Sequence, residues 1–403
     1  MRYLKTTAPR WLRTAFLIAA ACLALPATAA DWSGYVALDQ RSFLSSPAFD
    51  DQSDTDLSLV FEPELYHEWN EGKDSFTFTP FFRYDSQDSE RTHLDIRELY
   101  WQRVSRDWEL RVGISKVFWG VTESQHLVDI VNQTDLVENP DGEDKLGQPM
   151  VRLAWFRNWG TLELYLLPGF RERTFPGRDG RLRPELPVDT DRALYESSAE
   201  EGHLDAALRW SHVLGPFDVG LSYFRGTGRD PLLRLDTGSG EPRLLPFYEQ
   251  IDQFGLDLQA TVGGWLWKLE TIHRSGFEDD FSAATGGFEY TFGSPFGTGY
   301  DVGLLVEYLW DERGDQALTP FEDDVFLGTR WALNDVQSTE ILAGGVIDLD
   351  SDAASLLVEA SRRLKASWKI ELEWRGFVGI PPNDPAASLR ADDHFALRIA
   401  RYF

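Results

Sequence analysis

Residues 57–66 decide the fold and read Leu57-Ser58-Leu59-Val60-Phe61-Glu62-Pro63-Glu64-Leu65-Tyr66. Apolar side chains occupy every second position, and most of the positions between them are polar or charged. Because successive side chains of a β-strand point to opposite faces, the stretch predicts a strand with one apolar and one polar face. Residues 76–85 and 368–378 repeat the pattern. The chain is therefore expected to be all-β.

The same periodicity predicts eighteen strands, with sixteen as the alternative count. Most of them are near the length of about 9–11 residues that a tilted strand needs to cross a membrane. The predicted strands cover residues 33–44, 57–69, 74–85, 92–104, 108–119, 149–156, 161–171, 203–213, 217–225, 250–262, 265–274, 282–292, 299–310, 324–333, 338–348, 354–364, 368–378 and 393–403.

The connections alternate between short and long. Short turns such as 70–73 and 263–264 follow the even-numbered strands, whereas the longest loops, 120–148, 172–201 and 226–249, follow odd-numbered ones. Short turns at one end and long loops at the other are typical of outer-membrane barrels. In a soluble sandwich the apolar faces would meet in a core, whereas here the polar faces carry many charges and the strands continue to the last residue, Phe403. We therefore predict a transmembrane antiparallel up-and-down β-barrel with its short turns and both chain ends in the periplasm.

The first residues have the features of a secretion signal. A basic start precedes the apolar stretch 15–25 and the small-residue cleavage site Ala27-Thr28-Ala29. We predict a signal peptide at 1–29 and a single barrel domain at 30–403. Cys22 is the only cysteine, so the mature chain is expected to have no disulfide and no thiolate metal site. The mature chain also lacks an apolar run long enough for a transmembrane helix.

Acidic residues outnumber basic ones. Removing the four basic residues of the signal leaves 35 basic and 66 acidic residues, a net charge of −31. This balance argues against a nucleic-acid partner and favours cations in a pore or at the surface, although it also suits simple solubility in salt. The runs Glu278-Asp279-Asp280 and Glu322-Asp323-Asp324 are candidate calcium or magnesium sites, although they lack the spacing of a dedicated calcium loop.

The last strand is apolar at most alternate positions and ends on Phe403. It resembles the C-terminal signal that the barrel-assembly machinery reads in Gram-negative outer-membrane proteins. The mature chain as a whole resembles a porin-type barrel of 16 to 18 strands. This resemblance implies location in the outer membrane, contact with lipid and lipopolysaccharide, and a possible homotrimer. It also implies that the third external loop, 120–148, folds into the lumen and narrows it.

Charged residues then become candidates for a constriction of the pore. Acids on the inserted loop would face arginines on the barrel wall and set up a transverse field. Pairing of these charges with their neighbours is the alternative. Arg97 cannot be assigned to a face, because the alternation breaks on both faces between residues 94 and 104. The candidate lining residues are the acids Glu123, Asp129, Asp135, Glu138 and Asp141 and the arginines Arg83, Arg111, Arg152 and Arg209.

These features favour a passive channel for small polar solutes or ions with some preference for cations. No cofactor is expected. An enzyme is not expected either, because none of the seven histidines stands in a recognisable nucleophile setting. One alternative is a structural or adhesive barrel plugged by loops 172–201 and 226–249. Another is a channel specific for an oligosaccharide, a fatty acid or an exported polymer.

Overall fold

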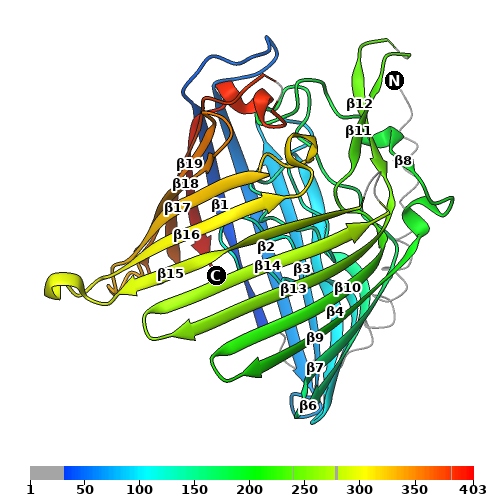
Figure 1. Cartoon of the computed structure of the whole chain (residues 1–403), viewed down its shortest axis with the longest axis vertical. Helices are drawn as coiled ribbons and strands as arrows, with labels where there is room; N and C mark the ends of the chain where they lie inside the picture. The colour runs from blue at the N-terminus through cyan, green and yellow to red at the C-terminus, as the bar shows by residue number, and fades with distance from the viewer. Residues whose placement is uncertain (1–30, 239, 277–279, 383) are drawn as a thin grey trace.

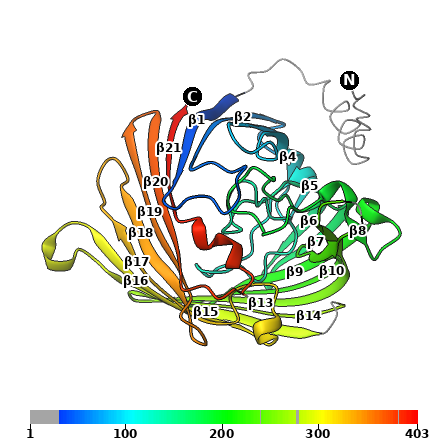
Figure 2. The same ribbon diagram turned by 90° about the horizontal axis from the view of Figure 1, so that it is seen from above.

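The computed structural model describes residues 31–238, 240–276, 280–382 and 384–403, so the predicted signal peptide lies outside the described residues. Eighteen antiparallel strands form one sheet, which closes where β1 pairs with β21 (Figures 1 and 2). The barrel strands are β1 (Asp31–Phe43), β2 (Thr55–Trp69), β3 (Asp74–Asp85), β4 (His93–Val104), β5 (Trp108–Ser115), β6 (Gln148–Arg157), β7 (Gly160–Pro168), β9 (Leu204–Leu214), β10 (Phe217–Thr227), β13 (Gln250–Val262), β14 (Trp265–Ser275), β15 (Phe281–Phe292), β16 (Asp301–Asp311), β17 (Asp323–Ala332), β18 (Glu340–Asp348), β19 (Ala354–Lys365), β20 (Trp368–Val378) and β21 (His394–Tyr402).

The predicted fold class is confirmed, with eighteen strands rather than sixteen. The fifth predicted strand is wrong at its end, because β5 stops at Ser115 and not at residue 119. There the side chain of Asn132 replaces the neighbouring strand as the hydrogen-bond partner of the backbone. Its Oδ1 accepts the N–H of Val117 at 2.9 Å, and its Nδ2 donates to the carbonyl of Ser115. The chain then leaves the wall of the barrel.

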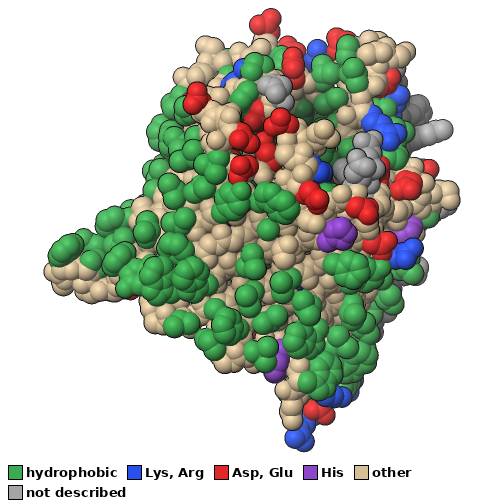
Figure 3. Space-filling model, viewed as in Figure 1, with side chains coloured by type: hydrophobic (Ala, Val, Ile, Leu, Met, Phe, Trp, Pro, Cys, Tyr) green, Lys and Arg blue, Asp and Glu red, His purple; other side chains and the backbone are tan. Residues whose placement is uncertain are grey.

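The alternation of side chains gives the barrel an apolar outer surface. On β2, Leu57, Leu59 and Phe61 are 40–46% exposed, whereas Ser58 and Val60 between them are almost fully buried. Large apolar side chains that remain exposed in this regular way suit contact with lipid. Figure 3 shows hydrophobic side chains over the middle of the wall, with Asp and Glu gathered at the end that carries the long loops.

In the part of the chain that the structure describes, no helix is both long and apolar enough to cross a membrane.

A β-bulge explains the broken alternation around Arg97. The pairing of β3 with β4 shifts between Thr79, which faces Glu98, and Pro80, which faces Ile96, so Arg97 has no partner residue. Proline has no N–H to donate to a neighbouring strand and is therefore found at bulges. The extra residue turns Arg97 inward, where it is 5% exposed.

At one end of the barrel, the long loops form a small sheet of their own that the sequence did not predict. It pairs β11 (Leu232–Asp236) with β12 (Arg243–Tyr248), and β12 with β8 (Leu194–Tyr195). The described connections also contain short 3₁₀ turns: η1 (Thr190–Arg192), η2 (Glu200–Gly202), η3 (Pro295–Gly297), η4 (Gly314–Gln316) and η5 (Ala387–Ala391).

Candidate functional site

The connection between β5 and β6, residues 116–147, contacts inward-facing side chains of strands on the other side of the barrel. We call it the cross-lumen segment. Two carboxylates hold its backbone. Glu270 on β14 accepts the N–H groups of Val121, Thr122 and Val128 at 2.6–3.1 Å. Glu307 on β16 accepts the N–H groups of Glu123 and Ser124 at 2.8–3.0 Å.

These hydrogen bonds satisfy the backbone of an irregular segment. A buried N–H without an acceptor would destabilise the fold. Each carboxylate therefore supplies the hydrogen-bond acceptors that a neighbouring strand supplies within a sheet. Glu270 is fully buried and Glu307 nearly so. The segment is therefore attached at two points to the wall formed by β14, β15 and β16.

An apolar cluster packs the base of the segment against the wall that runs from β6 to β15. Trp119, Val128 and Ile130 are at most 5% exposed and pack with buried residues of the wall such as Tyr165 and Phe224. Trp119 therefore lies inside the barrel and not at its outer surface. Its backbone N–H donates to Asp129 at 2.6 Å, which holds the residue inside the barrel.

His126 lies between two acids. Its Nε2 is 3.1 Å from Glu143 on the same segment, and its Nδ1 is 3.7 Å from Glu270. Burial alone would lower the pKa of His126, but the nearby carboxylates of Glu143 and Glu270 outweigh burial and raise it to about 10. The ring is therefore charged at neutral pH and adds an ionic contact to the attachment at β14.

Four predicted acids of the segment pair with basic residues of the wall. Glu138 contacts Arg83 at 2.6 Å and Asp135 contacts Arg97 at 2.6 Å. The other two pairs are Asp141 with Arg375 on β20 and Glu123 with Arg330 on β17, each at 2.7 Å. Asp129, the fifth predicted acid, instead accepts backbone N–H groups within the segment.

Of the four predicted wall arginines, only Arg83 faces the acids of the segment. Arg111 donates to Gln102 and Ser115, and Arg152 pairs with Glu109 and Glu163 on neighbouring strands. Arg209 forms a bidentate ion pair with Asp257 at 2.7–2.8 Å, and its guanidinium group lies over the ring of Trp119. The structure therefore does not bring these three arginines to the tip of the segment.

Several residues of the site were missing from the candidate set. Arg97 was hidden by the bulge, and Glu270 and Glu307 could not be recognised because they bind backbone and not a complementary charge. Arg330 and Arg375 occupy inward positions of the strand period. The strand period was the one signal available for these two arginines, but it does not predict which inward-facing charge contacts the cross-lumen segment.

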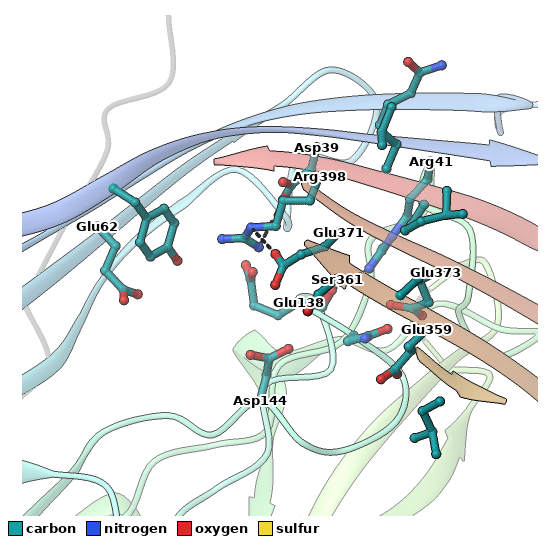
Figure 4. A pocket seen from close by; sticks show the side chains of 18 of the residues that line it. Asp39, Arg41, Glu62, Glu138, Asp144, Glu359, Ser361, Glu371, Glu373 and Arg398 are labelled. Carbon is teal, nitrogen blue, oxygen red and sulfur yellow. Dashed lines mark hydrogen bonds and ion pairs between the residues drawn. The ribbon is translucent and has the colours of Figure 1, made fainter. Parts of the chain in front are cut away.

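Two cavities lie along the segment and share Lys145 in their linings. The first, of about 440 Å³, lies between the tip of the segment and strands β1–β4 and β17–β21. Figure 4 shows Glu138 and Asp144 of the segment pointing into it opposite Glu371 and Arg398 of the wall. The second, of about 560 Å³, lies towards the end that carries the long loops, where residues 318–321, 385–386 and 388–389 also line it.

The first cavity is strongly charged but nearly balanced, with nine acidic and eight basic residues in its lining. Among the residues that the structure describes, Asp144 has no basic group within 4.0 Å. Enclosure by protein, together with the negative charges of Glu138, Asp141 and Asp135, raises the pKa of Asp144 to about 7. This carboxyl group therefore changes its charge near neutral pH.

One group in the described chain gathers metal-ligating atoms. Those of His93, Asp135 and Glu138 lie within 4.8 Å of one another. However, Glu138 pairs with Arg83, and Asp135 pairs with Arg97. The guanidinium groups already supply the positive charge that a cation would bring, so we assign this group to the ion-pair network.

The loop between β7 and β9 also reaches across the mouth of the barrel. The carboxylate of Asp88 accepts the N–H of Gly177 at 2.9 Å, and a Cβ on Gly177 or Gly180 would lie within 2.4 Å of that carboxylate. Further along the loop, Arg181 is 3% exposed in its side chain and pairs with Asp392 at 2.6 Å. The loop is therefore fixed to the far rim of the barrel.

The closed sheet, the apolar exterior and the charged interior define a transmembrane β-barrel of porin-like architecture. No family model matches the chain. No curated protein matches it either. Among solved structures, a triply substituted Rhodopseudomonas blastica porin is 13% identical, with a TM-score of 0.44, covering 93% of this chain and 100% of its own. Another variant of that porin is 12% identical with a TM-score of 0.46 and the same coverage. A likeness of this size carries no argument about function.

Proposed function

We propose that the protein is a passive channel of the outer membrane of a Gram-negative bacterium, for small polar solutes or ions, and that the cross-lumen segment forms its constriction. The observation that carries this proposal is the pair of charged cavities on either side of the segment, which share Lys145. Water-filled space on both sides of a charged narrowing is the arrangement that a selective pore needs. Lipid and lipopolysaccharide would surround the barrel, and a homotrimer is compatible with it.

Planar bilayer recordings of the purified protein test this function. We expect discrete conductance steps and, in a salt gradient, a reversal potential that indicates a weak preference for cations. The preference should be weak because the lining is nearly balanced, and its sign should follow the acidic excess of the chain. An absence of conductance would contradict the channel, and a clear preference for anions would contradict the selectivity.

The pH dependence of this selectivity gives a second prediction. Between about pH 6 and pH 8 Asp144, with its pKa of about 7, gains a negative charge beside the narrowing. We expect the cation preference to rise with pH over this interval and the Asp144→Asn channel to lack that rise. Asp218→Asn, an exposed change on β10, is the matched control and should behave like the unmodified protein. A rise of equal size in the Asp144→Asn channel would rule out this assignment.

A plugged structural barrel is the second candidate, because one specific observation favours it. The loop between β7 and β9 is fixed across the mouth through Asp88 and Arg181, and its residues Phe175 and Leu182 are buried. Swelling of liposomes in small sugars separates the two candidates. A channel lets the sugar in and the vesicles swell, whereas a plugged barrel leaves them unchanged.

A further inference from the structure

The second cavity, which we call the loop-side cavity, differs in charge from the first. Its lining contains seven Lys and Arg residues against five Asp and Glu, and the charged ring of His126 adds a further positive group. The first cavity is nearly balanced, and the whole chain has 66 acidic residues against 39 basic ones. An excess of positive charge in this one place therefore runs against the composition of the chain. Walls with an excess of one sign raise the local concentration of solutes of the opposite sign.

One part of the excess is a carboxylate that two arginines share. Asp230, in the loop between β10 and β11, lies 2.5 Å from Arg173 and 3.0 Å from Arg274 on β14. We call these three residues the arginine cluster. One carboxylate offsets only one of the two guanidinium groups, so the cluster keeps a positive charge. The side chain of Asp230 is 42% exposed and all three residues line the cavity, so a solute there can reach the cluster.

Lys145 is the second part of the excess, and it lines both cavities. Among the residues that the structure describes, no carboxylate oxygen lies within 4.0 Å of its ammonium group, which donates to Thr134 Oγ1 at 3.3 Å. Asp129 and Glu143 are the acids that act on it most strongly. However, Asp129 accepts backbone N–H groups, and Glu143 pairs with His126. An ammonium group has three N–H donors, so Lys145 has donors left for a bound anion.

Much of the remaining lining is apolar. The loop between β7 and β9 contributes Phe175 and Leu182, the loop before β17 contributes Leu318 and Phe321, and η5 contributes Leu389. Figure 2 shows η5 inside the ring of strands. A cavity of about 560 Å³ with apolar walls and a few charged groups has the size and character of a small-molecule site. A ligand that suits it has an apolar body and a negatively charged group.

We propose that the loop-side cavity binds small organic acids, with the carboxylate at Lys145 and the arginine cluster and the apolar body against the Phe and Leu side chains. Arg173 and Asp230 are among the charges that act on Lys145, so the cluster and the ammonium group are neighbours. A carboxylate would offset part of the positive excess and accept charge-assisted hydrogen bonds. This inference names a class of solute for the proposed channel, and the passage of that solute, but not its binding, rests on the proposed function. The nearly balanced lining of the first cavity does not oppose passage of such an anion beyond Lys145.

Ligand-detected NMR with the purified protein in an uncharged detergent tests the binding, with phenylacetate as the probe. We expect saturable binding with a Kd of about 1 mM, which suits a ligand of this size. Phenylacetamide has the same shape without the charge, and acetate has the charge without the ring. Each should bind about tenfold more weakly or not at all. Equal binding of either compound would overturn the proposal.

Substitutions at Lys145 locate the site. Lys145→Gln removes the ammonium group and should weaken phenylacetate binding by about tenfold, whereas Lys145→Arg keeps the charge and should retain most of the binding. Lys73→Gln is the matched control, because Lys73 is 61% exposed at a short turn, and it should bind like the unmodified protein. Equal binding by Lys145→Gln and Lys73→Gln would overturn the site. The comparison of phenylacetate with phenylacetamide needs no variant and decides the case if Lys145→Gln does not fold.

Bilayer recordings separate this site from the proposed function. Binding of phenylacetate by a protein that gives no conductance would support the site and contradict the channel. Conductance without binding of phenylacetate would support the channel and overturn the site.

Discussion

Deletion of residues 124–146 is expected to raise the single-channel conductance several-fold and to move the selectivity towards anions. The deletion removes the tip that lies between the two cavities. It also removes six acidic residues, Lys145 and the charged His126, while Arg83 and Arg97 stay on the wall without Glu138 and Asp135. The remaining lumen is wider and more positive. Bilayer recordings give the conductance and the reversal potential in one experiment.

A second variant keeps every residue of the segment and loosens its attachment. Glu270→Gln combined with Glu307→Gln removes the charges that accept backbone N–H groups of residues 121–128. We expect noisier channels with a smaller rise in mean conductance than the deletion gives. Retention of the folded barrel by both variants is checked by the shift in migration on detergent gels between unheated and heated samples. Unchanged conductance in both variants would mean that the segment does not narrow the ion path.

The barrel could be predicted from the sequence because its rules are local. Every second side chain of each strand faces lipid, so the apolar period marks the strand and its turns mark the ends. The predicted ends of β13 and β20 coincide with the observed ones. The prediction of a strand end or of a side chain's orientation fails where a single residue interrupts the alternation of side chains along a strand. Asn132 ends β5 early from a position far along the chain, and the bulge opposite Pro80 hides the orientation of Arg97.

The candidate site was predictable only in part, since it depends on where an irregular segment goes. The acids of the segment are visible in the sequence, and so are the arginines at inward positions. Which acid meets which arginine depends on the path of the segment, and Glu270 and Glu307 set that path by binding its backbone. Backbone contacts leave no pattern of complementary charge in a sequence. Arg152 and Arg209 were predicted in the same way, and they pair with acids of the barrel wall and not with the segment.

Replacement of Glu138 by Gln is expected to destabilise the protein by about 3–5 kcal/mol, the cost of breaking one side of a buried ion pair. The Glu138 carboxylate accepts three hydrogen bonds from Arg83, and both side chains are at most 7% exposed. Arg97 lies 4.0 Å away and would lose part of its compensating charge as well. The free energy of unfolding in urea, followed in lipid vesicles, measures the loss.

Glu71→Gln is the control, because Glu71 and Lys73 form an exposed pair at a short turn, with side chains 88% and 61% exposed. Such a pair contributes about 0–1 kcal/mol, so the free energy of unfolding of the control should stay close to that of the unmodified protein.

The pH dependence of stability distinguishes the unmodified protein from the Glu138→Gln variant. Burial opposes ionisation of Glu138, but Arg83, Arg91 and Arg97 outweigh burial and lower its pKa from 4.5 to about 2. The stabilisation is therefore complete above about pH 4.5 and is lost as the pH falls towards 2, a loss that the Glu138→Gln variant should not show. If both variants lost the same small amount, the ion pairs between the segment and the wall would not stabilise the barrel.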